Sequence, residues 1–148
     1  MSWFPILLVV HISLAVALLL PSLALPFVLR RAAGPPGGVA RFLMTMQGSG
    51  TLFIGLGLAL TGGAMLALLG PELLTQPWLL VALTLYAANL LVAAFISRPG
   101  LRRLVGIGAE GDEAGWRRLA RRQRWVAYAM GGLVGLIGFL MSVKPRLW

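Results

Sequence analysis

The sequence predicts an all-α fold: a polytopic membrane protein built as a four-transmembrane-helix bundle, with both termini on the outer side (N-out/C-out). The chain has 148 residues, of which 59% are hydrophobic and only 11% charged, whereas a soluble domain carries about 25% charged residues. The apolar residues gather into four runs, and a helix needs about 20 such residues to cross a bilayer. The arginines gather between the runs. These observations predict a single transmembrane domain over residues 1–148.

The first run, residues 3–29, contains no Asp, Glu, Lys or Arg. It is longer than the apolar core of a secretion signal, so we expect a retained helix. Pro21 and Pro26 lie inside it, and each favours a kink because proline removes a backbone donor. The other spans are expected at about 42–69, 78–96 and 125–143, and the cytoplasmic loops at 30–41 and 97–124. Pro and Gly residues, which end helices, follow the first three spans.

The basic residues are distributed unevenly between the two sides. The loop 30–41 holds Arg30, Arg31 and Arg41, and the loop 97–124 holds Arg98, Arg102, Arg103, Arg117, Arg118, Arg121, Arg122 and Arg124. The connection between the second and third spans holds none. The positive-inside rule therefore places both arginine loops in the cytoplasm. There they are expected to meet a lipid bilayer with an anionic inner leaflet rather than nucleic acid. The tryptophans agree, with Trp3, Trp78 and Trp148 at the outer interface and Trp125 at the inner one.

Residues 112–125, inside the second of these loops, have the pattern of a basic helix. Asp112 is suited to the N-cap and Glu113 to the first turn, since both favour a helix N-terminus. This helix either lies on the inner leaflet or extends the fourth span inward.

Small residues recur at helical spacing in two spans, and such faces let membrane helices approach closely. The second span has Thr51, Gly55, Ala59 and Gly63, and the fourth has Gly131, Gly135, Gly138 and Ser142. We expect both faces to pack inside the bundle and Gly135→Leu to disrupt that packing. The alternative is that a glycine face leaves a slot for a flat cofactor.

His11 is the only histidine of the chain and the most polar side chain of the first span. A rise of 1.5 Å per residue from Trp3 puts it about 12 Å inside the outer interface. Tyr86 lies at a similar depth in the third span, and Asn89 lies one turn further in. We expect the faces that carry these side chains to meet inside the bundle. There His11 would hydrogen-bond to Tyr86, to Asn89 or to a backbone carbonyl, because polar groups in hydrocarbon need partners.

An axial bond to the iron of haem b is the alternative role for His11, since bundle cores can hold haem. Met65 or Met141 would then supply the second ligand, or the iron would be five-coordinate. The chain has no cysteine, which excludes disulfides, thiolate metal sites, iron–sulfur clusters and covalent haem attachment. All acidic residues fall in expected loops, so no catalytic carboxylate pair is expected inside the membrane.

A family likeness rests on two short motifs. Leu25-Pro26 and Arg30-Arg31 follow His11 in the first span, and residues 141–145, Met-Ser-Val-Lys-Pro, end the last. In this layout the chain resembles bacterial four-helix membrane proteins related to the copper-resistance D domain and to the haem-binding membrane protoporphyrinogen oxidase. It is most similar to their uncharacterised branch. The resemblance implies the bacterial cytoplasmic (inner) membrane, associates His11 with haem, and matches Lys144 to the terminal lysine of the family.

Three hypotheses for function follow. The first is a non-catalytic inner-membrane protein that stands alone or serves as an accessory subunit of a membrane complex, with a membrane-protein partner or a second copy of itself. The second is a b-type haem-binding redox protein with His11 as axial ligand. The third, a small transporter, has weaker support, because no charge pair inside the spans marks a pathway. We do not expect an enzyme, because the sequence contains no evident set of catalytic residues.

Overall fold

The computed structural model describes residues 3–31 and 37–147, and this part of the chain contains helices and no strands. It confirms the predicted all-α four-helix bundle, because four continuous helices are long and apolar enough to cross a membrane. The first is α1 (Phe4–Arg31). The second consists of α2 (Gly38–Thr45), the π-helical turn η1 (Met46–Gly50) and α3 (Thr51–Leu69). The third consists of α4 (Pro77–Val92), the π-helical turn η3 (Ala93–Ser97) and α5 (Arg98–Glu110). The fourth is α6 (Glu113–Val143). A short 3₁₀ helix, η2 (Pro71–Thr75), connects α3 to α4.

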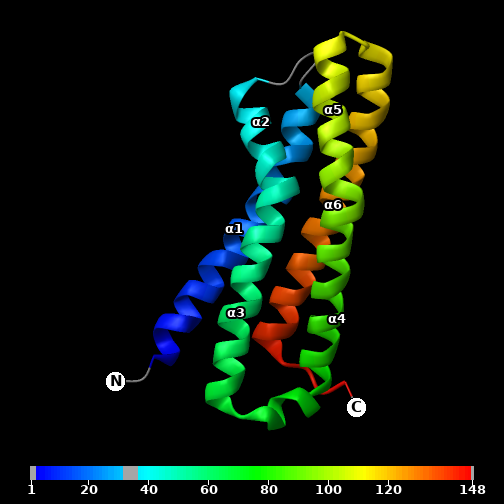
Figure 1. Cartoon of the computed structure of the whole chain (residues 1–148). Coiled ribbons are helices and arrows are strands. Elements are labelled where there is room, and N and C mark those ends of the chain that lie inside the picture. Colours follow the sequence, from blue (N-terminus) through cyan, green and yellow to red (C-terminus); the bar gives the residue numbers. More distant parts are fainter. Residues whose placement is uncertain (1–2, 32–36, 148) are drawn as a thin grey trace.

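The helices are arranged around α6, which packs against α1 and α4, while α1 also packs against α3. Figure 1 shows both chain ends at one end of the bundle and the α5–α6 turn at the other. Towards its N-terminus α1 leans away from α6, so the bundle is wider at the end that carries the termini (Figure 1). The outer surface of the bundle carries many exposed apolar side chains, as expected for a surface that faces lipid.

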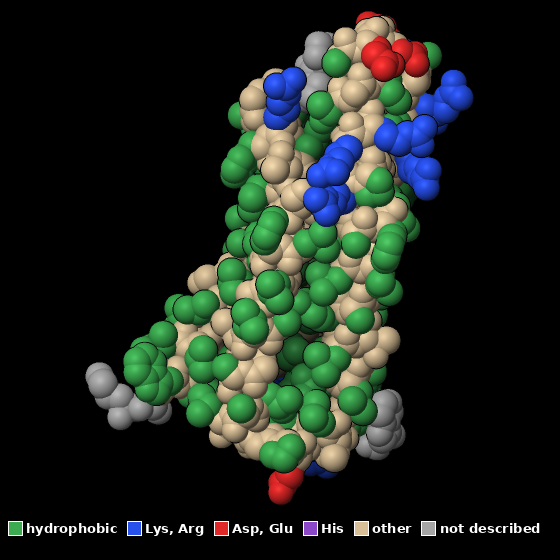
Figure 2. All heavy atoms as spheres, in the orientation of Figure 1, with side chains coloured by type: hydrophobic (Ala, Val, Ile, Leu, Met, Phe, Trp, Pro, Cys, Tyr) green, Lys and Arg blue, Asp and Glu red, His purple; other side chains and the backbone are tan. Residues whose placement is uncertain are grey.

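The basic side chains gather at the end opposite the chain termini. Figure 2 shows arginines over α2, α5 and the first half of α6, with acidic side chains near the α5–α6 turn. Below them apolar side chains predominate on this face, and an acidic side chain lies at its lower end. The arrangement matches the predicted separation of arginine loops from termini. We call this end of the bundle the arginine end.

The expected loop over residues 97–124 is wrong, because this segment is almost entirely helical. The third helix continues through Pro99 and Gly100 to Glu110, and α6 begins at Glu113. Proline normally ends a helix because it lacks an N–H and its ring crowds the preceding turn. Here the wider turn η3 lies immediately before α5, and a π-type turn absorbs such an irregularity without breaking the helix. The expected third span is therefore the N-terminal part of one continuous helix, Pro77–Glu110.

Asp112 caps α6 as predicted, since its side chain accepts a hydrogen bond of 3.0 Å from the backbone N–H of Gly115. The basic segment 112–125 is thus an inward extension of the fourth span and not a separate surface helix. Trp116, only 3% exposed, packs at this end in a core cluster that joins four helices. The buried members of that cluster are Leu25, Leu29, Met44, Leu101, Leu104, Trp116, Ala120 and Ala127.

The second helix begins at Gly38, earlier than the expected start near residue 42. Its small-residue face packs only in its inner half: Thr51 and Gly55 are buried, whereas Ala59 and Gly63 are exposed. Residues 32–36, which belong to the expected first loop, and Trp148 at the expected outer interface lie outside the described residues.

The small-residue face of α6 also differs from the prediction. A Cβ atom added at Gly131 would lie 3.4 Å from Cβ of Ser22, so this glycine does pack against α1. Gly135 and Gly138 are exposed, and an added Cβ at either would meet no described neighbour within 4 Å. The predicted packing role of Gly135 is therefore wrong. Val134, the preceding residue, is buried in a cluster with Leu18 of α1 and Leu58 of α3, whereas Gly135 lies on the adjoining exposed side of α6.

Candidate functional site

His11 faces α3 and not α4. Its Nδ1 atom lies 2.8 Å from Oγ1 of Thr61, and the imidazole is half-buried. The Thr61 hydroxyl also lies 2.9 Å from the carbonyl oxygen of Gly57. One hydroxyl has a single proton, so Thr61 either donates it to Gly57 and accepts from Nδ1–H of His11, or donates it to Nδ1 itself. In the first of these arrangements Nε2 of His11 keeps a free lone pair.

The predicted hydrogen bond from His11 to Tyr86 or Asn89 is not formed. The Tyr86 hydroxyl instead donates to the backbone carbonyl of Gly55 on α3. Asn89 is completely buried, and both polar atoms of its amide lack a hydrogen-bond partner among the described residues. The face that carries Asn89 does point into the bundle, since Ala82 on α4 and Ala93 at the start of η3 are buried as well.

A second set of polar side chains lies inside the bundle where α1, η1 and α6 meet. The Ser22 hydroxyl donates to Oε1 of Gln47 over 3.0 Å, and Nε2 of Gln47 lies 3.1 Å from the sulfur of Met130. All three side chains are buried. Gln47 belongs to the π-helical turn η1, whose extra residue changes the direction of the side chains that follow it. These contacts connect three helices in a layer that apolar residues alone would not specify.

Further polar atoms in this inner half have no partner among the described residues. They are Ser97 Oγ, Arg98 Nε, Trp116 Nε1 and Gln123 Oε1. Gln123 lies so close to Gly100 that an added Cβ there would come within 1.9 Å of its Nε2 atom. A side chain at this position would therefore have to displace the Gln123 amide, which shows how closely α5 approaches α6 here. The arginine end combines tight packing with unpaired polar groups.

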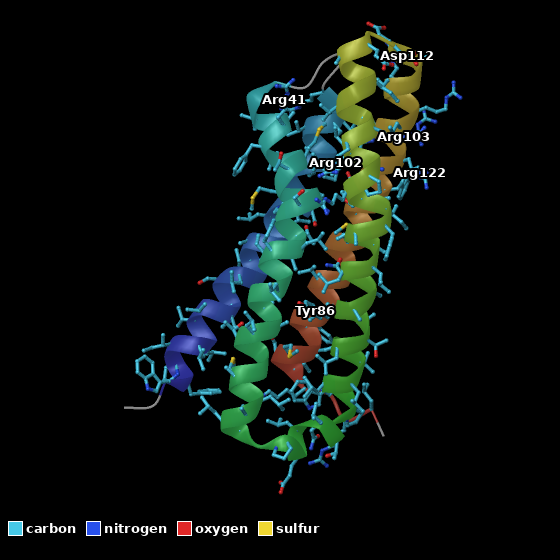
Figure 3. All side chains as sticks on the ribbon, in the orientation of Figure 1. Arg41, Tyr86, Arg102, Arg103, Asp112 and Arg122 are labelled. Carbon is cyan, nitrogen blue, oxygen red and sulfur yellow. The ribbon has the colours of Figure 1, made fainter. Side chains whose placement is uncertain are left out.

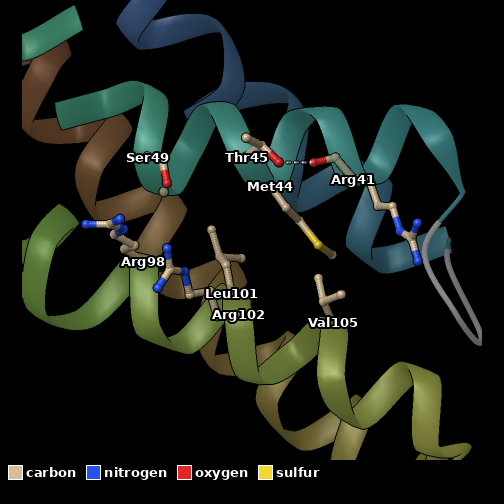
Figure 4. A pocket seen from close by; sticks show the side chains of 9 residues that line it. Arg41, Met44, Thr45, Ser49, Arg98, Leu101, Arg102 and Val105 are labelled. Carbon is tan, nitrogen blue, oxygen red and sulfur yellow. Dashed lines mark hydrogen bonds between the residues drawn. The ribbon is translucent and has the colours of Figure 1, made fainter. Parts of the chain in front are cut away.

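A groove with a volume of about 400 Å³ opens between α2–η1 and α5 at the arginine end. We call it the arginine groove. Its lining is Arg41, Met44, Thr45, Gly48 and Ser49 on one side and Arg98, Leu101, Arg102 and Val105 on the other. Figure 4 shows Ser49, Arg98 and Arg102 gathered at one end and Arg41 at the other, with Met44 between the two helices. Figure 3 places Arg102 on the flank of α5 that faces α2, and Arg103 on the other flank.

The sequence indicates His11, Tyr86 and Asn89 as site residues, but it predicts neither the arginine groove nor the contact between Thr61 and His11. The groove combines residues that are distant in sequence, so the positions of its arginines along the chain indicate topology but not a shared site. The one indication in the sequence is the presence of polar residues, Gln47, Thr51 and Thr61, inside an apolar run. Polar side chains within a membrane span need hydrogen-bond partners, so they point to contacts with other helices.

The arrangement of side chains does not suggest a metal cluster: no group of three or more His, Cys, Asp or Glu among the described residues is placed to hold a metal ion. Comparisons of the chain with protein-family models, with curated proteins and with solved structures find no match. The resemblance to the copper-resistance D group therefore stays a prediction.

Proposed function

We propose that the chain is a non-catalytic, multi-pass protein of the bacterial cytoplasmic membrane that serves as an accessory subunit of a membrane complex. The arginine end would face the cytoplasm and both termini the outside, in keeping with the positive-inside rule. Support for this orientation comes from the arginines at one end of the bundle and the termini at the other (Figures 1 and 2).

The observation that carries the accessory role is the open small-residue face of α6. Gly135 and Gly138 point into space that no described side chain fills. Membrane helices associate through such faces, because small residues let two backbones come close and gain van der Waals contact. Gly131 on the same face already does so against Ser22 of α1. A transmembrane helix of another subunit would pack against Gly135 and Gly138 in the same way, where α6 has no described neighbour.

Photo-crosslinking in native membranes tests this role, and the absence of cysteine from the chain allows single labelled sites. A benzophenone attached to Gly135→Cys is expected to give one discrete adduct with another membrane protein. The matched control is Leu136→Cys, whose side chain is exposed on a neighbouring face of α6 and is expected to meet only lipid.

No adduct at Gly135→Cys, or the same adducts from both positions, would contradict the accessory role. An adduct with a second copy of the chain would replace it with a homo-oligomer. A companion measurement separates association from folding: Gly135→Leu is expected to keep the thermal stability of the isolated protein in detergent, because the added side chain meets no described neighbour.

A second candidate function, haem binding, is favoured by the hydrogen bond between His11 and Thr61. Histidines that bind a metal usually donate the other ring N–H to a neighbouring acceptor, which fixes the tautomer and the ring orientation. Nδ1 of His11 makes such a contact to Thr61, so the residues fit in this respect. Nε2 of His11 would bind the iron. Met65, one helical turn after Thr61 and half-buried, is the candidate for a second ligand.

A visible spectrum of the protein purified from haem-replete cells distinguishes the two candidates. Haem binding predicts a Soret band that His11→Ala abolishes and that Thr61→Val weakens, since valine cannot orient the imidazole. A colourless wild-type preparation would exclude the second candidate and leave the first.

A further inference from the structure

The arginine groove has more positive charge than the chain itself neutralises. Arg41, Arg98 and Arg102 line it, and no acidic residue does. The ion pair found among the described residues, between Arg117 and Glu113 at 3.5 Å, lies on α6, outside the groove. Like charges that share a small volume repel each other. An anion in the groove would remove this repulsion.

The groove also offers a suitable set of hydrogen-bond donors. Arginine guanidinium groups match the oxygens of a phosphate in a two-pronged geometry. The Nε atom of Arg98 is buried without a partner among the described residues. The Ser49 hydroxyl lies with Arg98 and Arg102 at one end of the groove (Figure 4). The Thr45 hydroxyl, in contrast, already donates a hydrogen bond of 2.9 Å to the backbone carbonyl of Arg41.

The backbone around these donors is held in place by close packing. A Cβ atom added at buried Gly48 would lie 3.4 Å from Cα of Arg98, so the two helices touch at this point. The π-helical turns η1 and η3 pack against each other there. Met44 and Leu101, each 3% exposed, form the apolar floor of the groove. The site is therefore preorganised, which lowers the entropic cost of binding.

The depth of the groove matches the headgroup layer of a bilayer. Trp78 begins the outer end of α4, and Arg98 lies about 30 Å further along the helix at 1.5 Å per residue. The hydrocarbon core of a bilayer is also about 30 Å thick. Arg98 and Ser49 thus lie where the phosphates of the lipids at the arginine end are expected.

An apolar surface lies directly on the membrane side of the donors. Phe53 follows Ser49 by four residues, so the two side chains share a helix face. Phe95 lies in the turn η3, three residues before Arg98. Both rings are strongly exposed, Phe53 by 77% and Phe95 by 74%. A lipid with its phosphate in the groove would lay its acyl chains over these rings. A free phosphate would not use them.

We propose that the arginine groove binds the phosphate of an anionic membrane lipid, with Arg98, Arg102 and Ser49 around the phosphate and the acyl chains on Phe53 and Phe95. This site does not depend on the accessory role, because it lies at the other end of the bundle from Gly135.

Lipid titration of the full-length protein in dodecyl maltoside micelles, followed by native mass spectrometry, tests the site. Phosphatidylglycerol is expected to bind at least tenfold more tightly than phosphatidylcholine. Arg102→Gln is expected to weaken phosphatidylglycerol binding about tenfold, the loss of one hydrogen-bonded charge pair. The matched control is Arg103→Gln, which removes the same charge from the adjacent exposed position on the other flank of α5 (Figure 3) and is expected to change binding less than twofold.

Two further arms identify the source of the phosphate. Phe53→Ser is expected to weaken phosphatidylglycerol binding severalfold, and inorganic phosphate at equal concentration is expected not to compete. Competition by inorganic phosphate, with no effect of Phe53→Ser, would overturn the lipid assignment in favour of a soluble anion. Equal losses from Arg102→Gln and Arg103→Gln would show attraction to net charge only and overturn the site. Helical circular dichroism of each variant confirms folding, and Arg102 is exposed, so its replacement leaves the core intact.

Discussion

Replacing Trp116 with alanine is expected to lower the free energy of unfolding by about 3–5 kcal/mol. The indole is 3% exposed and belongs to the core cluster that joins α1, α2, α5 and α6 at the arginine end. Leu101 and Leu104 of α5 are among its partners in that cluster. The substitution removes the buried apolar surface of the ring and leaves a cavity that rigid helices cannot fill. Its Nε1 atom has no hydrogen-bond partner among the described residues, so no lost hydrogen bond adds to this figure.

Reversible unfolding in dodecyl maltoside micelles with rising sodium dodecyl sulfate measures this loss. Trp125→Ala is the matched control, because Trp125 is the same residue type on the same helix but is 70% exposed. It contacts Tyr128 edge to face, with ring centroids 6.1 Å apart, and its removal is expected to cost less than about 1 kcal/mol. Equal losses from the two variants would show that the α5–α6 extension is not packed as described.

The second large effect is expected at Gly55, where Gly55→Leu should destabilise the bundle by about 1–3 kcal/mol through overpacking. A Cβ atom there would lie 2.6 Å from Cδ2 of Leu90 on α4. The larger leucine side chain would push Leu90 aside and separate α3 from α4. It would also disturb the hydrogen bond that Tyr86 donates to the Gly55 carbonyl, which adds about 1 kcal/mol.

Gly63→Leu provides the comparison, since Gly63 lies on the same helix in the same small-residue series. An added Cβ at Gly63 meets no described neighbour within 4 Å, and leucine favours helix more than glycine does. Its stability in the same micelles is therefore expected to equal or exceed that of the wild type. A stable Gly55→Leu variant, or a loss at Gly63 as large as at Gly55, would contradict the close contact between α3 and α4.

The four helices and the separation of charge could be predicted because a bilayer leaves few alternatives. A long apolar run must form a helix to satisfy its backbone, as in residues 4–31. The continuation of the third helix through Pro99 could not be predicted. Proline and glycine end helices in most sequences, and the turn η3 that accommodates them has no distinct sequence pattern. The N-cap at Asp112 was predictable because capping depends on local chemistry alone.

The site residues show the limits of periodicity more clearly. Helical spacing correctly put Asn89 on a buried face, but it does not say which helix lies opposite. His11 therefore pairs with Thr61 on α3 and not with α4. The same limit applies to Gly135, which shares a face with Gly131 but has no described neighbour within 4 Å of an added Cβ. The arginine groove requires the helices that carry Arg41 and Arg98 to lie beside each other, and this depends on tertiary packing.

The length of the third helix has a practical consequence. Pro77–Glu110 is one continuous rod of 34 residues, or about 51 Å at 1.5 Å per residue, against a hydrocarbon core of about 30 Å. Some 20 Å therefore projects beyond the lipid tails, ending at the left-handed Gly111, whose φ is 75°. A fluorophore attached at this turn would be held at a fixed position at the end of this helix. Energy transfer from it to a dye on the lipid headgroups would report the tilt of the whole bundle.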